Sequence, residues 1–429
     1  MKLIKNKIIK NIYWLVIDKI IILILQFFIG VKIANHYGKI NYGEYSYAVS
    51  IVAFAPIILE ILNVRIIKKF FYKYNFNLIV SIVSTFKNII SIIILIFIII
   101  FKFVIGIEEN LFLMLVFLSI DNIFITSTIG IENYFEYKLN SKYIVLTNNV
   151  IKIFSYLLQY LGIILGFKII MIPIIRCIGS LIRGILLRYN YRKVYKTNEK
   201  ILFSYKILKK IIKESYYLWL SFISYIISTN MDKVMIGNML GVGEVGVYSI
   251  GVQLIGILTI IISSFQSTIF SELLELYNEK DIKKYEKKYI FYTKILTNIY
   301  FVGIIISIIV LKKLFEHIFS IEYIKAINIY IILSIGILVK ANVFLRSSHI
   351  VLANRSKVLL KSELIAMMSN LMLNYFLIKR YGIYGAATAT TITQFISLWI
   401  IDLFSIDGRK LLKKHLSGFW IFDIKKYIR

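Results

Sequence analysis

The chain has 429 residues, of which 59% are hydrophobic, and its mean hydropathy is +0.77. A soluble domain is about 45–50% apolar, so this composition is typical of an integral membrane protein. Lys and Arg number 52 against 23 Asp and Glu, for a formal net charge of +29. The basic residues lie between apolar stretches rather than on one solvated face, so we do not expect a nucleic-acid-binding protein. The single cysteine, Cys177, excludes a disulfide framework and a cysteine metal cluster.

The apolar stretches are unbroken, as in residues 89–101 (IISIIILIFIIIF), which favours spanning helices over the alternating strands of an outer-membrane barrel. The basic N-terminal stretch resembles a signal peptide, but its apolar part is too long and no small-residue cleavage site follows, so we predict a retained first helix. Windows of about 20 apolar residues predict twelve spans in all. In chain order they cover residues 12–34, 44–66, 78–103, 111–134, 143–165, 168–187, 214–237, 245–270, 289–311, 327–349, 357–378 and 383–405.

Most Lys and Arg fall in connections on one side of this arrangement. By the positive-inside rule that side is cytoplasmic, and it holds both termini. The longest basic connection, residues 188–213, is predicted to be an amphipathic linker helix on the anionic inner leaflet. We therefore expect an N-terminal six-helix lobe (1–187), this linker, a C-terminal six-helix lobe (214–405) and a basic cytoplasmic tail (406–429).

A short motif occurs twice, as YGKINYGEYSYAVSIV from residue 37 and LGVGEVGVYSIGVQLI from residue 240. An offset of about half the chain aligns Gly38 with Gly241, and Tyr45 with Tyr248. It also maps the first two spans onto the seventh and eighth. The fold class that we predict is all-α integral membrane, with about twelve transmembrane helices in two six-helix lobes related by a parallel pseudo-twofold repeat. The glycines suit a tight turn that requires positive φ.

Three blocks of the sequence resemble a known family: residues 38–57, 231–254 (MDKVMIGNMLGVGEVGVYSIGVQL) and 381–392 (YGIYGAATATTI). They are similar to the bacterial polysaccharide-biosynthesis flippases of the O-antigen and capsule type. These belong to the multidrug/oligosaccharidyl-lipid/polysaccharide exporter superfamily. The sequence differs from many relatives at residues 55–68, which include Glu60 and Asn63.

The resemblance implies an alternating-access transporter with a cationic central cavity, driven in part by an ion gradient. The implied substrate is an undecaprenyl-pyrophosphate-linked oligosaccharide, flipped from the cytoplasmic to the outer face of the bacterial inner membrane. The expected partners are anionic membrane lipids and the polysaccharide polymerase and export machinery. We expect no cofactor, no metal and no catalytic residue, so the protein is predicted not to be an enzyme. The sequence has no phosphate-binding loop of the G-x-x-x-x-G-K-[ST] type for nucleotide.

A charge within a span costs about 2.5–3.5 kcal/mol, so each requires a reason. In the fifth span Asn149, Lys152, Tyr156 and Gln159 follow at helical spacing and form one polar stripe. A stripe of this length faces either a wet cavity or polar groups of another helix. In the sixth span Arg176 and Arg183 lie seven residues apart, on one face.

Arginine offers a planar fork to phosphate oxygens, which fits a pyrophosphate ligand, although Arg183 could instead reach the cytoplasmic interface. We also assign Lys32 in the first span and Lys340 in the tenth to the cationic cavity. Asp18, Asp121 and Glu132 are the ion-coupling candidates, with the last two on one face of the fourth span. Structural ion pairs between helices would explain the same pattern.

Two other functions remain open at this point. A proton- or sodium-coupled multidrug exporter of the same superfamily would have the same fold and a smaller substrate. A membrane-embedded polysaccharide polymerase or transferase would require a catalytic group on the outer face. The longest outer connection, residues 312–325, holds one His and two Glu.

Overall fold

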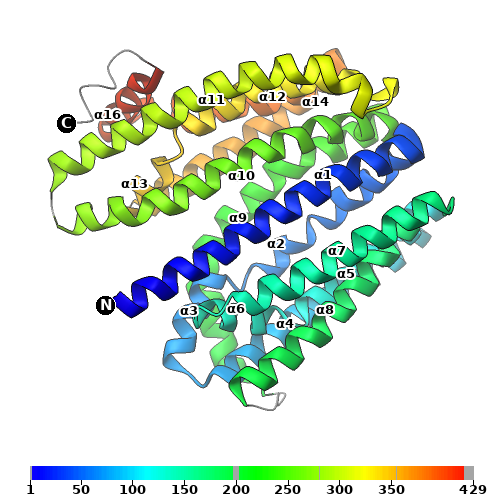
Figure 1. Cartoon of the computed structure of the whole chain (residues 1–429), viewed down its shortest axis with the longest axis horizontal. Helices are drawn as coiled ribbons and strands as arrows, with labels where there is room; N and C mark the ends of the chain where they lie inside the picture. Colours follow the sequence, from blue (N-terminus) through cyan, green and yellow to red (C-terminus); the bar gives the residue numbers. More distant parts are fainter. Residues whose placement is uncertain (1, 197–201, 280, 354, 420–429) are drawn as a thin grey trace. The chain divides into compact units, whose positions relative to one another are not determined.

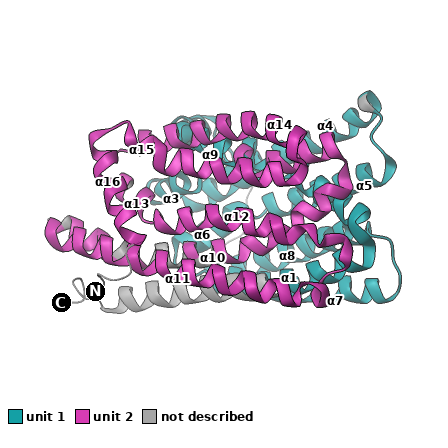
Figure 2. Ribbon diagram, turned by 90° about the horizontal axis from the view of Figure 1, so that it is seen from above, with its two compact units in different colours: residues 1–226 teal, residues 227–429 magenta. Residues whose placement is uncertain are grey.

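The computed structural model describes residues 2–196, 202–279, 281–353 and 355–419, and within these residues the chain is helical and has no strand. The chain divides into two compact units, residues 1–226 and 227–429 (Figure 2). Because the boundary falls inside helix α9 (Tyr205–Leu240), the two units share that helix. The lobe boundaries expected from sequence stay a prediction.

The first unit contains eight helices among its described residues, besides the first part of α9 (Figure 1). They are α1 (Lys2–Val52), α2 (Ala55–Leu59), α3 (Val64–Lys73), α4 (Phe76–Ile105), α5 (Glu109–Thr126), α6 (Ile129–Tyr137), α7 (Lys142–Ile164) and α8 (Met171–Tyr195). Helix α5 packs against α1, α4 and α8, and α7 packs against α1 and α8.

The second unit is built around α12 (Lys325–Asn342), which packs against α10 (Val242–Asn278), α11 (Ile282–Ile318) and α14 (Ser356–Phe395). The remaining helices are α13 (Arg346–Leu352), α15 (Ile401–Leu403) and α16 (Ile406–Leu416), with a π-helical turn over Ile396–Ile400. Helix α16 packs against α11, so this part of the predicted tail is a docked helix.

Seven stretches of the described residues are long and apolar enough to cross a membrane. They are Leu25–Lys73, Phe76–Val104, Glu109–Thr126, Val242–Thr259, Ile282–Ile318, Ile321–Ile350 and Lys357–Leu403. The protein is therefore an all-α membrane protein. The first and last stretches each contain a break, because Gly38 and Gly382 have positive φ inside α1 and α14. The division into twelve spans and the pseudo-twofold repeat remain predictions.

The two aligned glycines of the repeated motif have similar backbone conformations. Gly38 has φ 70° and ψ 172°, and Gly241 has φ 96° and ψ 162°. A residue with a Cβ is strained at such angles, so the glycine is required by the turn. The second glycines of the motif, Gly43 and Gly246, lie inside helices and need no special conformation.

Two predicted elements differ from those observed. The predicted linker helix over 188–213 is divided, because α8 continues to Tyr195 and α9 begins at Tyr205. The predicted fourth span is broken at 127–128, where the Ser127 and Thr128 hydroxyls donate to carbonyls of the preceding turn. Asp121 and Glu132 therefore belong to different helices, α5 and α6, and not to one continuous face.

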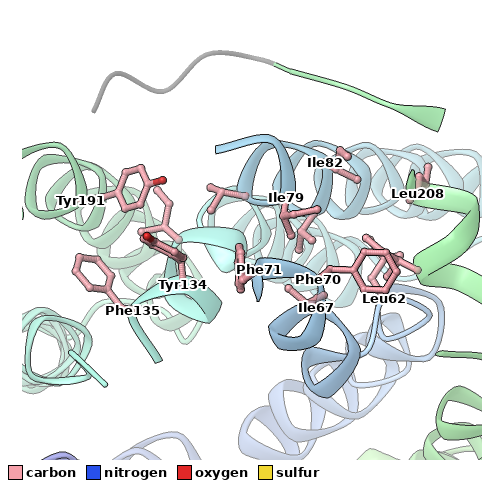
Figure 3. Packing of buried hydrophobic residues seen from close by; sticks show 14 of the residues in the cluster. Leu62, Ile67, Phe70, Phe71, Ile79, Ile82, Tyr134, Phe135, Tyr191 and Leu208 are labelled. Atoms are coloured by element: carbon pink, nitrogen blue, oxygen red, sulfur yellow. The ribbon is translucent and has the colours of Figure 1, made fainter. Parts of the chain in front are cut away.

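The first unit has a dense hydrophobic core where α3, α4, α6, α8 and α9 meet (Figure 3). Phe70, Phe135, Tyr191 and Leu208 are among its buried side chains. This core holds α4 against α6 and α8.

Candidate functional site

An ion pair between α5 and α8 lies at the centre of the polar cluster of the first unit. Arg176 Nη2 on α8 lies 3.2 Å from Asp121 Oδ2 on α5, and Asp121 retains only 5% of its side-chain exposure. The Ser180 hydroxyl, one turn along α8, donates to the second oxygen of Asp121. Arg176 Nη1 donates to the hydroxyl of Tyr45 on α1 at 3.0 Å. Three helices therefore meet at one guanidinium group.

A second ion pair lies two turns further along α8. Arg183 Nη2 is 2.5 Å from Glu132 Oε1 on α6, and its Nε donates to Asn148 Oδ1 on α7 at 2.6 Å. The side chains of Arg183 and Glu132 are 12% and 18% exposed. Arg183 is thus paired inside the helix bundle, whereas the alternative from sequence placed it at the cytoplasmic interface. Its Nη1 is buried and has no hydrogen-bond partner among the described atoms.

The polar stripe of α7 lies on the buried side of that helix. Asn149 and Gln159 are buried, and Lys152 and Tyr156 are half-buried. Lys152 is close enough to Glu132 for their charges to interact, and Tyr156 has the same relation to Arg176. The exposed side of α7 is apolar, with side chains such as Val150, Phe154, Leu157 and Leu161.

Close contact between α7 and α8 depends on a glycine. A Cβ added at Gly179 on α8 would lie 2.6 Å from Ser155 Oγ on α7. The two helices can therefore approach closely, which brings the stripe of α7 to the arginines of α8.

Lys32 and Lys340 are not part of this cluster. Lys32 is exposed on α1, and the side chain of Asp18 lies outside the described residues. Lys340 belongs to the second unit, where it is half-buried and interacts with the charge of Glu363. Among the residues whose positions are described, no three His, Cys, Asp or Glu side chains form a group that could hold a metal ion.

Sequence reasoning missed several partners. Tyr45 was noted only for its place in the repeated motif, yet it binds Arg176, while its aligned counterpart Tyr248 donates to Asp232 at 2.5 Å in the second unit. The buried Lys87 on α4 pairs with Glu60 at 2.7 Å. A charged residue in the middle of an apolar helix was the signal that could have identified Lys87.

The cluster thus holds three cationic side chains, Arg176, Arg183 and Lys152, beside two carboxylates, Asp121 and Glu132. Guanidinium groups bind carboxylate and phosphate oxygens with similar geometry. An anionic ligand and the two carboxylates are therefore alternative partners for the same cations.

Comparison with known proteins identifies the family of the chain. Residues 8–270 match the family described as polysaccharide biosynthesis protein. The capsular polysaccharide biosynthesis protein CapF of Staphylococcus aureus is 28% identical over 410 residues, which cover 91% of this chain and 97% of CapF. A putative O-antigen transporter of Shigella flexneri is 24% identical over 201 residues, 47% of each chain.

Solved structures show the same fold. The lipid II flippase MurJ in an inward closed conformation matches with a TM-score of 0.73 at 17% identity, over 96% of this chain and 95% of that one. A multidrug resistance MATE family transporter of the MOP superfamily, inward-facing, matches with a TM-score of 0.71 at 14% identity, over 93% and 96%. The chain therefore belongs to the polysaccharide biosynthesis protein family, and its several apolar helices make it a multi-pass membrane protein.

Proposed function

We propose that the protein flips undecaprenyl-pyrophosphate-linked oligosaccharide units from the cytoplasmic to the outer face of the bacterial cell membrane by alternating access. The proposal is supported mainly by the cluster of cationic side chains Arg176, Arg183 and Lys152. Membership of the polysaccharide biosynthesis protein family supports the class of substrate. A pyrophosphate cannot enter a low-dielectric cavity without partners for its charges. A surplus of cations over carboxylates offers such partners.

The two carboxylates of the cluster are the proposed ion-coupling groups, and Asp18 remains a third candidate. The carboxylate of Asp121 and a phosphate oxygen of the substrate would compete for the guanidinium group of Arg176. Protonation of Asp121 would remove its charge and leave Arg176 to the substrate. Under this proposal the coupling ion acts on the partner of the arginine, and Lys32 and Lys340 add positive charge along the path.

The cell membrane, with both termini in the cytoplasm, is the proposed location. Anionic lipids of the inner leaflet are the proposed partners of the basic connections. The polymerase and export machinery of the same polysaccharide are proposed to receive the product.

A coupled drug exporter is the second candidate, because the fold also matches the multidrug resistance MATE family transporter. Purified protein in proteoliposomes separates the two functions. We expect movement of a defined undecaprenyl-pyrophosphate-linked oligosaccharide, measured by its accessibility to an external glycosidase, and no uptake of a cationic dye. Dye transport without movement of the lipid-linked sugar would favour the drug exporter.

A further inference from the structure

Two tyrosines lie beside Arg176 in the first unit. Tyr45 on α1 accepts a hydrogen bond from Arg176 Nη1 at 3.0 Å. Tyr156 on α7 lies close enough to Arg176 and to Tyr45 for electrostatic interaction with both. The three side chains come from three different helices, α1, α7 and α8, and together they form one site (Figure 1).

The hydroxyl protons of both tyrosines lack an acceptor. An arginine can only donate, so Tyr45 accepts in its bond with Arg176 and keeps its own O–H for another partner. No acceptor for this proton is found among the described residues, and the Tyr156 hydroxyl makes no hydrogen bond to them either. Both side chains are half-buried, and a tyrosine hydroxyl that is withdrawn from water normally has a hydrogen-bond partner. The two hydroxyls are therefore donors suited to a ligand.

Arg176 also has donors that the protein does not use. One N–H group donates to Tyr45 and one to Asp121, and the others have no acceptor among the residues that the structure describes. The side chain of Arg176 is 38% exposed, whereas that of Arg183 is 12% exposed. Of the two arginines, Arg176 is therefore the more accessible to a ligand.

The aligned tyrosine of the repeated motif has a different kind of partner. Tyr248 in the second unit is fully buried and donates to Asp232 at 2.5 Å. Its hydroxyl proton is thus bound by a residue of the protein. Tyr45 instead accepts from a cation, and its proton remains unused among the described residues. The difference indicates that the hydroxyl of Tyr45 serves a ligand rather than the fold.

We propose that Tyr45 and Tyr156 bind the same phosphate group as Arg176 and donate their hydroxyl protons to its oxygens. The Tyr45 hydroxyl is a strong donor because it accepts from a cation, and hydrogen bonds in such a chain polarise one another. The inference rests on the proposed function, because it takes the pyrophosphate of a lipid-linked sugar as the ligand. A carboxylate of an acidic sugar has the same acceptor chemistry and is the other source of an anion.

Equilibrium binding of radiolabelled farnesyl pyrophosphate to the purified full-length protein in detergent tests the proposal. This probe carries a pyrophosphate on a short isoprenoid and has no sugar. Tyr45→Phe and Tyr156→Phe each remove one O–H group and keep the ring, so each should weaken binding about tenfold or more. Tyr160→Phe is the matched control: it removes a hydroxyl from an exposed position on α7, one turn after Tyr156, and binding should be unchanged.

Tyr156→Phe keeps the test valid if Tyr45→Phe lowers the melting temperature, because it breaks no hydrogen bond among the described residues. An Arg176→Gln background separates direct contact from an effect through the arginine. If Tyr45 donates to the phosphate, Tyr45→Phe should weaken binding by a similar factor in this background. If Tyr45 only holds Arg176 in place, Tyr45→Phe should have no further effect once Arg176 is replaced, and this result would overturn the proposed contact.

Competition identifies the source of the anion. Inorganic pyrophosphate should displace the probe at a much lower concentration than glucuronate, which carries the carboxylate of an acidic sugar. The reverse order would overturn the assignment to phosphate. Wild-type binding that is unchanged in Tyr45→Phe and Tyr156→Phe would refute the inference and leave the transport proposal intact. Failure of the wild-type protein to bind any pyrophosphate would refute both the inference and the pyrophosphate site of the proposed function.

Discussion

At the scale of single residues, several charges among the described residues form ion pairs between distant segments of the chain. In the first unit Arg176 pairs with Asp121 and Arg183 with Glu132, each between two helices, and Lys87 on α4 pairs with Glu60, which follows α2. In the second unit Arg346 pairs with Asp402 at 2.6 Å. Removal of one partner of a buried pair leaves the other charge uncompensated, and this is more costly than removal of both. Substitution of one member of a buried ion pair should therefore lower the stability of the protein more than substitution of both members.

Lys87 provides the clearest test of this point, because its side chain is only 1% exposed and lies 2.7 Å from Glu60. Lys87→Ala should destabilise the protein by about 3–5 kcal/mol, and the double variant Glu60→Gln, Lys87→Met should recover much of that loss. Lys102→Ala is the control on the same helix, since its partner Glu109 is 68% exposed and such pairs contribute about 0–1 kcal/mol. Thermal unfolding in detergent measures all three. Equal losses for Lys87→Ala and Lys102→Ala would contradict the prediction.

At the scale of elements, glycine positions decide where helices break. Gly241 precedes α10 with φ 96°, and a Cβ added there meets no atom within 4 Å. Gly241→Ala should therefore destabilise the protein by about 1–3 kcal/mol through backbone strain alone. Gly256→Ala, inside α10 and also without close neighbours, should be neutral or stabilising because alanine favours helix. The melting temperature of Gly241→Ala should therefore be lower than that of Gly256→Ala. Equal melting temperatures, or the reverse order, would contradict the requirement for glycine at this turn.

The docking of α16 is expected to depend on pH. His415 is fully buried, and its Nε2 lies 2.7 Å from the Tyr289 hydroxyl. Burial lowers the pKa of His415 to about 3, and the nearby charges of Arg346, His349 and Lys414 contribute in the same direction. Since the unfolded pKa is about 6.5, the stability from neutral His415 is complete above that value and is lost as the pH falls toward 3.

Acidification from about pH 7.5 to about pH 4.5 should therefore loosen α16. A Leu412→Cys variant, at a buried position on this helix, reports the change by its reaction with a thiol reagent that is insensitive to pH. Addition of His415→Gln should make the reaction independent of pH in this range. An equally steep pH dependence in that variant would assign the effect to other groups.

Helices were predictable where apolar runs are long, and the turns at Gly38 and Gly241 were predictable from their glycines, but the break at 127–128 was not. Residues such as Ser127 and Thr128 are compatible with a helix, and the hydroxyl-to-carbonyl bonds that accompany the end of α5 depend on the local backbone. The polar stripe of α7 was predictable from spacing, but its partners were not, because the proximity of Lys152 to Glu132 depends on packing between distant segments.

At the scale of the whole molecule, topology is the first claim to test. Lys196 follows α8, and Asn41 lies just after the break at Gly38; both are exposed. If twelve spans place both termini in the cytoplasm, Lys196→Cys and Asn41→Cys should react from opposite sides of the membrane in intact cells. Labelling of both by a reagent that cannot cross the membrane would rule out this topology.

The proposed transport function rests on the cationic cluster. If its residues bind the substrate, Lys152→Ala and Arg176→Ala should reduce glycan export without lowering the amount of protein in the membrane. Arg176→Lys should restore only part of the activity, because a point charge replaces a fork that binds two oxygens. If the residues serve only the fold, abundance and activity should fall together, because Asp121 loses its partner.

The most direct measurement is therefore glycan export per inserted molecule in the Lys152→Ala, Arg176→Ala double variant, with export and membrane abundance determined on the same cells. We predict that export per molecule is strongly reduced while the protein remains inserted. Normal export by a stably inserted double variant would contradict the proposal that these residues form the anion site of the substrate.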